Sequence, residues 1–251
     1  MPGTVRPCRV LCRARSWSWM MQGMKLLAVL LLALGIAYGS HGRFWTLPDH
    51  LNPWAPLSYD AAPGWLTGYK LQRLKSEPAA CQAFMSGTPW RFQAVPDRDT
   101  GQGCGFSNAI QVRQTSVALS SSFTLSCPAA ASLALWERNV LQPAAQATLG
   151  TSVQRIEHLG TYACRNVYGR EAGNRSQHAT ANALDIAGFT LGDGRRISVA
   201  RQWEGDAPAA TFLREVHQGA CRFFDGVLGP EYNQAHADHF HLDSGRHRIC
   251  R

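Results

Sequence analysis

The chain has 251 residues, of which 45% are apolar and 17% charged, a composition typical of a globular protein long enough for one large domain or two small ones. Its formal net charge of +8 depends largely on residues 1–39, which hold five basic residues and no acidic one; the remainder carries 20 basic against 17 acidic residues. Because no basic stripe interleaved with aromatic residues accompanies this small excess, we expect no nucleic-acid partner.

Residues 1–39 predict a signal peptide or a membrane anchor. Basic residues precede an uncharged apolar run at 26–38, and Ala-Tyr-Gly at 37–39 fits a cleavage site. A segment over 17–38 could instead span about 30 Å of hydrocarbon, with Lys25 inside the bilayer. A buried core helix is the third interpretation. From the two export interpretations we expect a periplasmic or otherwise extracytoplasmic domain, anchored in the inner membrane.

Cysteine usage agrees with export. An even number of cysteines follows the leader, without the C-x-x-C spacing of thiolate zinc sites. We therefore expect three disulfides of open pairing, each stabilising the fold by about 2–4 kcal/mol. The six cysteines are Cys81, Cys104, Cys127, Cys164, Cys221 and Cys250.

The first half of the chain begins with a Pro- and Trp-rich stretch at 40–64 that predicts an extended linker. A helix is expected over 68–85, split or kinked at Pro78. The Gly- and Pro-rich segment 89–108 is expected to be irregular, and alternation over 112–123 indicates one or two strands.

A second helix is expected from Cys127-Pro128 to Gly150, kinked near Pro143. The remaining elements are a strand at 152–164, a hairpin of strands 183–191 and 196–200 joined by Gly192-Asp193-Gly194, a helix at 208–228 that Gly229-Pro230 ends, and a short strand at 239–242. Helices segregated from strands make the fold class α+β, with a small antiparallel sheet flanked by helices. We expect one disulfide-stabilised domain over 65–251.

Histidine and aspartate cluster in two segments about sixty residues apart, around 176–185 and 238–243. Two imidazoles and one carboxylate can hold a catalytic zinc ion, which takes three protein ligands at roughly 2.0–2.2 Å and keeps a fourth position open. Asp185 lies between two apolar residues of an expected strand, where an unpaired carboxylate costs several kcal/mol. Because residues two apart on a strand face the same side, His239 and His241 could both point toward Asp185.

The same residues resemble known motifs. Residues 176–185 resemble the S-x-H-x-x-G-x-A-x-D motif of the D-Ala-D-Ala metallopeptidase, lysostaphin and hedgehog group, and 238–241 resembles its closing H-x-H or E-x-x-H element. With Tyr162 to Arg165, Val227 to Pro230 and 236–243, they look like the bacterial extensin-like C-terminal domain family over roughly residues 60–251. The resemblance implies a small antiparallel sheet flanked by helices, and zinc-dependent cleavage of peptides of the bacterial wall.

The resemblance also implies roles for single residues. By this resemblance, the zinc ligands are His178, Asp185 and His241, and proton handling falls to His239 and Asp238. Arg165 would bind an oxyanion or a terminal carboxylate, and Ser176 would orient the substrate. One position departs from the motif, because Ala181 replaces its glycine. If the backbone there needs a positive φ, alanine strains the loop.

Several of these residues have a structural alternative. His239 could form a structural hydrogen bond, and Asp238 could only orient His236 or His239. Arg165 could form a surface salt bridge, and Ser176 could only cap its loop. For Asp243 we expect an ion pair with Arg246 and no part in the chemistry.

The expected function is therefore that of an exported, monomeric zinc peptidase acting on peptidoglycan cross-link peptides, as an endopeptidase or a carboxypeptidase. Zinc lowers the pKa of its bound water toward about 7, and Asp238 or His239 would accept the proton. Two alternatives stay open: a non-catalytic wall-binding domain that keeps zinc for structure, and a disulfide-stabilised scaffold that sequesters metal.

Overall fold

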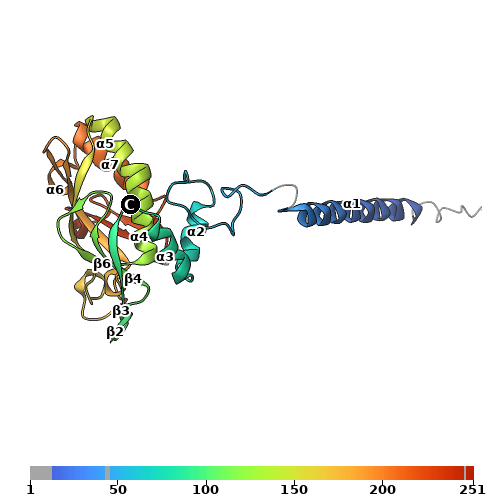
Figure 1. The fold of residues 1–251 in the computed structure, drawn as a ribbon, viewed down its shortest axis with the longest axis horizontal. Coiled ribbons are helices and arrows are strands. Elements are labelled where there is room, and N and C mark those ends of the chain that lie inside the picture. Colours follow the sequence, from blue (N-terminus) through green and yellow to red (C-terminus); the bar gives the residue numbers. More distant parts are fainter. Residues whose placement is uncertain (1–12, 43–45, 246) are drawn as a thin grey trace, which may run out of the picture. The chain divides into compact units, whose positions relative to one another are not determined.

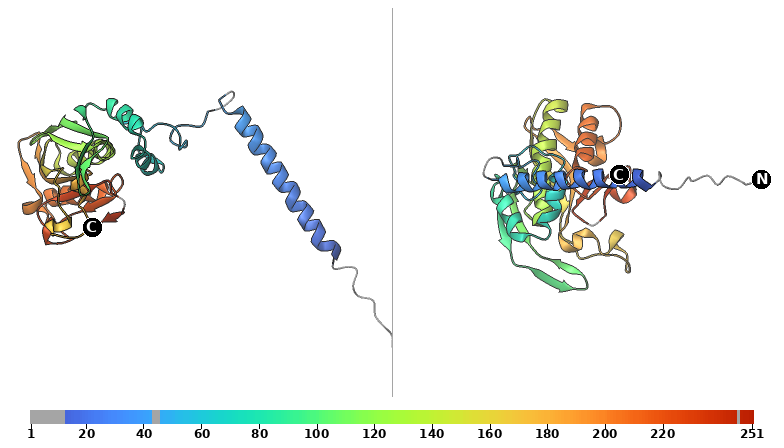
Figure 2. Two further views of the ribbon diagram at one scale, coloured as in Figure 1. Left: turned by 90° about the horizontal axis from the view of Figure 1, so that it is seen from below. Right: turned by 90° about the vertical axis from the view of Figure 1, so that its right-hand side faces the viewer.

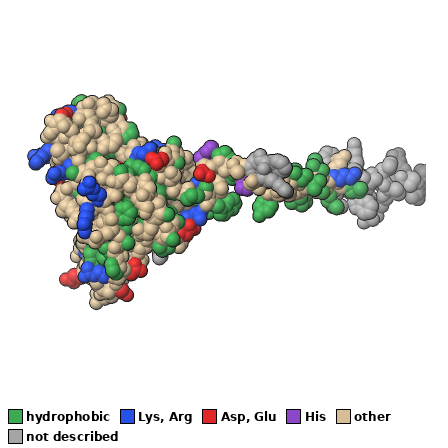
Figure 3. Space-filling model, viewed as in Figure 1, with side chains coloured by type: hydrophobic (Ala, Val, Ile, Leu, Met, Phe, Trp, Pro, Cys, Tyr) green, Lys and Arg blue, Asp and Glu red, His purple; other side chains and the backbone are tan. Residues whose placement is uncertain are grey.

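The computed structural model describes residues 13–42, 46–245 and 247–251. The chain divides into two compact units, 1–51 and 52–251. Helix α1 (Arg13–Ser40) forms most of the first unit, and its Met21–Ser40 stretch is long and apolar enough to cross a membrane, with mean hydropathy 1.8. Figure 3 shows hydrophobic side chains along this helix. None of that stretch is buried, which is compatible with a leader or an anchor and not with a core helix.

The second unit begins with two short helices, α2 (Thr67–Leu74) and α3 (Pro78–Ser86), so Pro78 splits the predicted helix as expected. Some of the expected linker packs on the domain, since Ala55 and Tyr59 are buried. The Tyr59 ring lies under the Arg138 guanidinium, 4.8 Å from its carbon to the ring centroid.

The expectation of an irregular segment over 89–108 is wrong. It contains three strands, and three more follow: β1 (Arg91–Val95), β2 (Arg98–Gly101), β3 (Cys104–Phe106), β4 (Ala109–Gln114), β5 (Ala118–Leu119) and β6 (Phe123–Ser126). β1, β4 and β6 form a three-stranded sheet, and β2 pairs with β3. β1 and β2 have no buried face, so their sequences lack the alternation of apolar and polar residues that predicts a strand. They are strands because they pair with β4 and β3.

The helix predicted from Cys127 is confirmed, and it changes geometry on the way. α4 (Cys127–Trp136) continues through a π-helical turn, Glu137–Leu141, into α5 (Gln142–Leu149), and Gly150 ends it at φ 68°. This π-helical turn lies just before Pro143. A proline inside a helix removes one backbone hydrogen bond and displaces the preceding turn, which explains the wider geometry there.

The main sheet has seven strands in the order β12-β10-β11-β8-β7-β5, with β9 paired to the second half of β8. The bounds of the elements in this part are β7 (Val153–Gly160), β8 (Ala183–Leu191), β9 (Arg196–Ser198), α6 (Val199–Gln202), α7 (Pro208–Ala220), β10 (Gly226–Leu228), β11 (Phe240–Asp243), β12 (Ile249–Cys250), and three 3-10 turns, η2 (Val167–Gly169), η3 (Gln177–Thr180) and η4 (Gln234–His236). The predicted hairpin is confirmed as β8 and β9. Pairings are antiparallel except at the two sheet edges, so the fold is α+β as predicted.

One boundary differs from the prediction. α7 ends at Ala220 and not at Leu228, and residues 226–228 form β10. Strand β10 pairs with β11, and a Cβ added at Gly226 would lie only 2.0 Å from Asp243 Oδ2. The tertiary pairing overrides a sequence that locally continues the helical pattern.

The core lies between the main sheet and the long helices. Trp136 of α4 and Phe212 of α7 both contact the Phe189 ring of β8, so the two helices cover the same face of the sheet. Helices α5 and α7 lie side by side (Figures 1 and 2). The expected three disulfides are present, as Cys81–Cys127, Cys104–Cys164 and Cys221–Cys250.

Candidate metal centre

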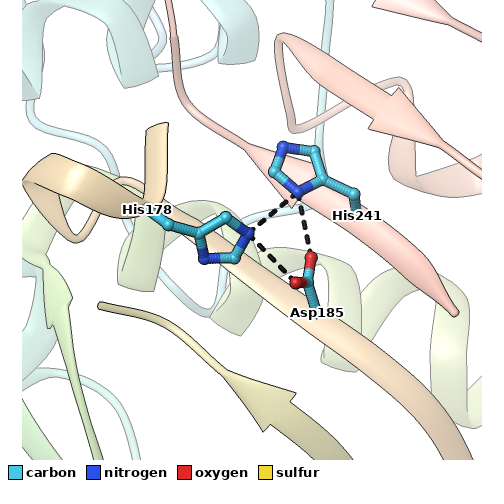
Figure 4. Close-up of side chains that lie close together, drawn as sticks. All are labelled: His178, Asp185 and His241. Carbon is cyan, nitrogen blue, oxygen red and sulfur yellow. Dashed lines mark hydrogen bonds and ion pairs between the residues drawn. The ribbon is translucent and has the colours of Figure 1, made fainter. Parts of the chain in front are cut away.

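Three side chains converge from two paired strands and the turn before them (Figure 4). Asp185 lies on β8 and His241 directly opposite it on β11, in antiparallel register. His178 lies in η3, which Ser176 caps by accepting a hydrogen bond from the His178 backbone N–H at 3.3 Å. All three side chains are buried.

The distances between the inward atoms of the three side chains suit a metal ion. His178 Nε2 lies 3.1 Å from Asp185 Oδ2 and 3.1 Å from His241 Nδ1, and His241 Nδ1 lies 2.9 Å from the other carboxylate oxygen, Asp185 Oδ1. Ligand atoms around a tetrahedral zinc with bonds of about 2.0–2.1 Å are separated by about 3.3 Å. One ligand atom from each residue, all within 4.8 Å of one another, can therefore bind the same ion.

Second partners determine which ring nitrogens face the centre. His178 Nδ1 lies 2.9 Å from the Thr161 carbonyl, and His241 Nε2 lies 3.1 Å from Asp243 Oδ2. Because a carbonyl and a carboxylate can only accept, each of these nitrogens donates, and in the neutral rings the inward nitrogen carries a lone pair. Two lone pairs 3.1 Å apart are stable only when they share a cation, either a proton or a metal ion.

The pKa values indicate the same demand for positive charge. Burial by itself raises the pKa of Asp185, but hydrogen bonds from His178 and His241 hold it well below its usual range. Burial lowers the pKa of His241, but the carboxylates of Asp185 and Asp243 outweigh it and raise that pKa to about 9. Without a metal ion, the site retains a proton that a bound cation would replace.

The three residues line a cleft of about 1070 Å³ that also includes Arg165, Ser176 and His239 in its wall. Its size suits a peptide-sized ligand.

His239 stands next to the ligand set. Its Nε2 lies 3.7 Å from Asp185 Oδ1, and its Nδ1 donates to Asp238 Oδ1 at 2.7 Å. That bond leaves the lone pair on Nε2, facing the centre. The Asp238 side chain is 65% exposed, and it contacts the site through its hydrogen bond with His239.

Arg165 and Ser176 are joined through the backbone, because the Ser176 N–H donates to the Arg165 carbonyl at 3.1 Å. Arg165 is exposed, with its side chain at the cleft wall. The structure thus brings six of the seven proposed site residues to one cleft, and the seventh, Asp238, contacts His239.

The role of Asp243 was not predicted from the sequence, and strain at Ala181 was predicted only on condition of a positive φ. Asp243 orients His241; Arg246, its expected partner, lies outside the described residues. Its position two residues after His241 on a strand was the available signal. Ala181 adopts φ 52° and ψ 29°, a left-handed conformation that favours glycine, so the alanine is strained there.

A buried His–Asp–His cluster, at the wall of a large cleft in a disulfide-linked α+β domain, defines a protein with a candidate metal site. Residues 79–251 match the family model described as Extensin-like protein C-terminus, and the chain belongs to this family. No curated protein and no solved structure matches the chain.

Proposed function

We propose that the protein is an exported zinc-dependent peptidase that hydrolyses amide bonds in peptidoglycan cross-link peptides. The observation that carries the proposal is the convergence of His178 Nε2 and His241 Nδ1 on the Asp185 carboxylate, with the opposite ring nitrogens held by Thr161 and Asp243. Three ligands on one side of an ion leave its other side to the cleft, as catalytic zinc sites do and closed structural sites do not.

The donor set supports zinc as the metal. Imidazole nitrogen suits zinc, copper, iron and nickel, and a His₂-carboxylate set is one that hydrolytic zinc enzymes use. Ca²⁺ and Mg²⁺ prefer oxygen ligands, so two nitrogen donors disfavour them. The resemblance of residues 176–185 and 238–241 to motifs of zinc peptidases supports the same choice.

The bound ion would supply Lewis acidity that makes a water nucleophilic near neutral pH. His239, with its free Nε2 facing the centre, accepts the proton of that water and returns it to the leaving amine. Asp238 keeps the His239 ring in the required tautomer. The Arg165 guanidinium at the cleft wall binds the developing negative oxygen, which in comparable sites is worth about 3–4 kcal/mol.

The proposed substrate fits the proposed location. An apolar N-terminal helix and three disulfides are compatible with an exported and membrane-anchored chain, and wall peptides lie outside the cytosol. We place the domain in the periplasm as a monomer, held to the inner membrane by α1.

The test uses the full-length protein in detergent micelles, incubated with purified sacculi, with new amino groups as the readout. Wild type loaded with one equivalent of zinc should release amines, and His239→Ala should keep the zinc but lose the activity. His178→Ala should lose both, whereas His50→Ala, which changes an exposed histidine, should lose neither.

Zinc binding and tight sacculus binding without amine release would contradict the peptidase and favour the wall-binding alternative. Stoichiometric zinc retained by His178→Ala would contradict the metal centre itself.

A further inference from the structure

A second cavity, of about 470 Å³, lies beside the metal cleft. Lys75, Thr180, Asn182 and Ser244 line both, so the two cavities adjoin. Ser244 directly follows Asp243, which orients His241, and its backbone N–H donates to the Asn182 carbonyl at 3.0 Å. A ligand whose middle lies over the metal centre can therefore extend into this second cavity.

Three residues that line the second cavity each carry a buried polar side-chain atom without a hydrogen-bond partner among the described residues. These atoms are Asn108 Nδ2, Ser126 Oγ and Ser244 Oγ. Ser126 is only 4% exposed and Ser244 only 6%. Buried polar side-chain atoms are nearly always paired, so three unpaired ones on residues of one cavity point to a ligand that pairs with them.

The backbone holds these side chains in place while leaving their polar atoms free. The Cys127 N–H donates to the Asn108 carbonyl at 2.8 Å, and the Ser126 N–H donates to the Ala181 carbonyl at 2.8 Å. Ser126 is the N-cap residue of α4, yet its hydroxyl makes no capping bond, which is the usual role of serine there. Its hydroxyl therefore has no partner within the described part of the chain.

The hydrogen-bond donors around the cavity favour an anion. Arg98 lines it beside one acidic side chain, Asp99, which already accepts a hydrogen bond from the Gly101 N–H at 2.8 Å, whereas Lys75 is already paired with Asp225 at 2.8 Å. The N-terminal end of α4, where Ser126 lies, adds partial positive charge. An amide N–H and two hydroxyls can all donate, and a carboxylate can accept from several donors at once.

We propose that the second cavity is a subsite for a carboxylate-bearing arm of the peptide substrate, bound by Asn108, Ser126 and Ser244. This inference rests on the proposed peptidase function, since it places the reacting amide over the metal centre. It makes the free carboxylate of a wall peptide a specificity determinant that is separate from Arg165.

The experiment measures binding of N-acetyl-alanyl-alanine and of its C-terminal carboxamide to the full-length protein in micelles, both zinc-loaded and chelated. The carboxylate peptide should bind in both states, and the carboxamide about tenfold more weakly or worse, because hydrogen bonds to a charged acceptor are the stronger ones. The double variant Ser126→Ala/Ser244→Ala should bind the carboxylate peptide about tenfold more weakly than wild type, or worse. Ser132→Ala, which removes another buried hydroxyl of α4, is the matched control and should not change binding.

Two further measurements separate binding from folding. The double serine variant should melt at the same temperature as wild type or higher, because it removes buried hydroxyls without partners. Asn108→Asp keeps the shape of the side chain but adds a negative charge. It should therefore lower the affinity for the carboxylate peptide and leave the affinity for the carboxamide unchanged.

Equal affinity for the two peptides overturns the proposal, as does unchanged binding in both the double serine variant and Asn108→Asp. Binding that disappears on chelation also overturns it, because the carboxylate would then lie on the metal. Selective binding of the carboxylate peptide without hydrolysis of sacculi would contradict the peptidase function and support the anion subsite. Hydrolysis without selective binding would support the peptidase function and contradict the anion subsite.

Discussion

Asp243 accepts a hydrogen bond from His241 Nε2 at 3.1 Å, two residues away on the same strand, and so turns His241 Nδ1 toward Asp185. The other carboxylate oxygen accepts from the Gly245 N–H at 2.7 Å, which holds the carboxylate itself in place. The carboxylate thus decides which nitrogen of His241 is free to bind a metal.

Asp243→Asn should weaken zinc binding by about 10–100-fold, as loss of such outer partners does in other metal sites. The amide removes the negative charge that favours Nε2–H and the metal-binding tautomer. Competition with a chromogenic chelator measures the affinity, and Asp206→Asn, at an exposed position, serves as control. An unchanged affinity would mean that His241 keeps its orientation without this carboxylate.

Ala181→Gly should change the free energy of unfolding by less than about 1 kcal/mol. Relief of left-handed strain, worth about 1–2 kcal/mol, offsets the lost methyl burial of about 0.8 kcal/mol and the higher chain entropy of glycine. Ala130→Gly is the matched control, since Ala130 is equally buried but lies inside α4. There nothing offsets the loss, so we expect about 1.5–2 kcal/mol of destabilisation in urea unfolding. Similar losses at both positions would show that Ala181 is not strained.

Glu137 should make the fold less stable as pH rises. It is fully buried, and burial raises its pKa from 4.5 to about 7 despite hydrogen bonds from Ser116. Because the folded-state pKa is the higher one, the stabilisation is complete below about pH 4.5 and is lost as pH rises through 7, by about 3 kcal/mol in total.

Glu137→Gln should remove this dependence. In chelated protein, the variant should gain stability relative to wild type between pH 4.5 and 8, whereas Glu204→Gln, at an exposed site, should track wild type. Urea unfolding at a series of pH values measures the difference. A constant difference between Glu137→Gln and wild type across this range would contradict the raised pKa.

Loss of the Cys104–Cys164 disulfide should weaken metal binding as well as stability. Cys164 follows Thr161, whose carbonyl orients His178, and the Ala163 N–H donates to the His178 carbonyl at 3.1 Å. Replacing both cysteines by alanine should cost about 2–5 kcal/mol of unfolding free energy and lower zinc affinity.

Removing Cys221–Cys250 in the same way should lower stability alone, because that bridge joins the end of α7 to β12, away from the His178 turn. Equal effects of the two double variants on zinc affinity would contradict a local role for Cys104–Cys164.

Features that depend on neighbouring residues could be predicted from the sequence. The apolar leader is visible as a run, the α4–α5 segment as a proline start with a glycine end, and the β8–β9 hairpin as two strands around Gly192-Asp193-Gly194. The three candidate metal ligands were also accessible, because each lies in a short segment with a motif spacing and a carboxylate flanked by apolar residues.

Features that depend on distant partners could not be predicted and follow from the three-dimensional fold. The fold paired the six cysteines, made strands of β1 and β2 although neither has a buried face, and made β10 of residues 226–228, which were predicted as helix. It also brought the Thr161 carbonyl to His178, and placed Ser126 and Ser244 in the lining of one cavity. Local spacing encodes turns and amphipathic faces, but strand pairing, ring orientation and the walls of a cavity depend on contacts between residues far apart in the chain.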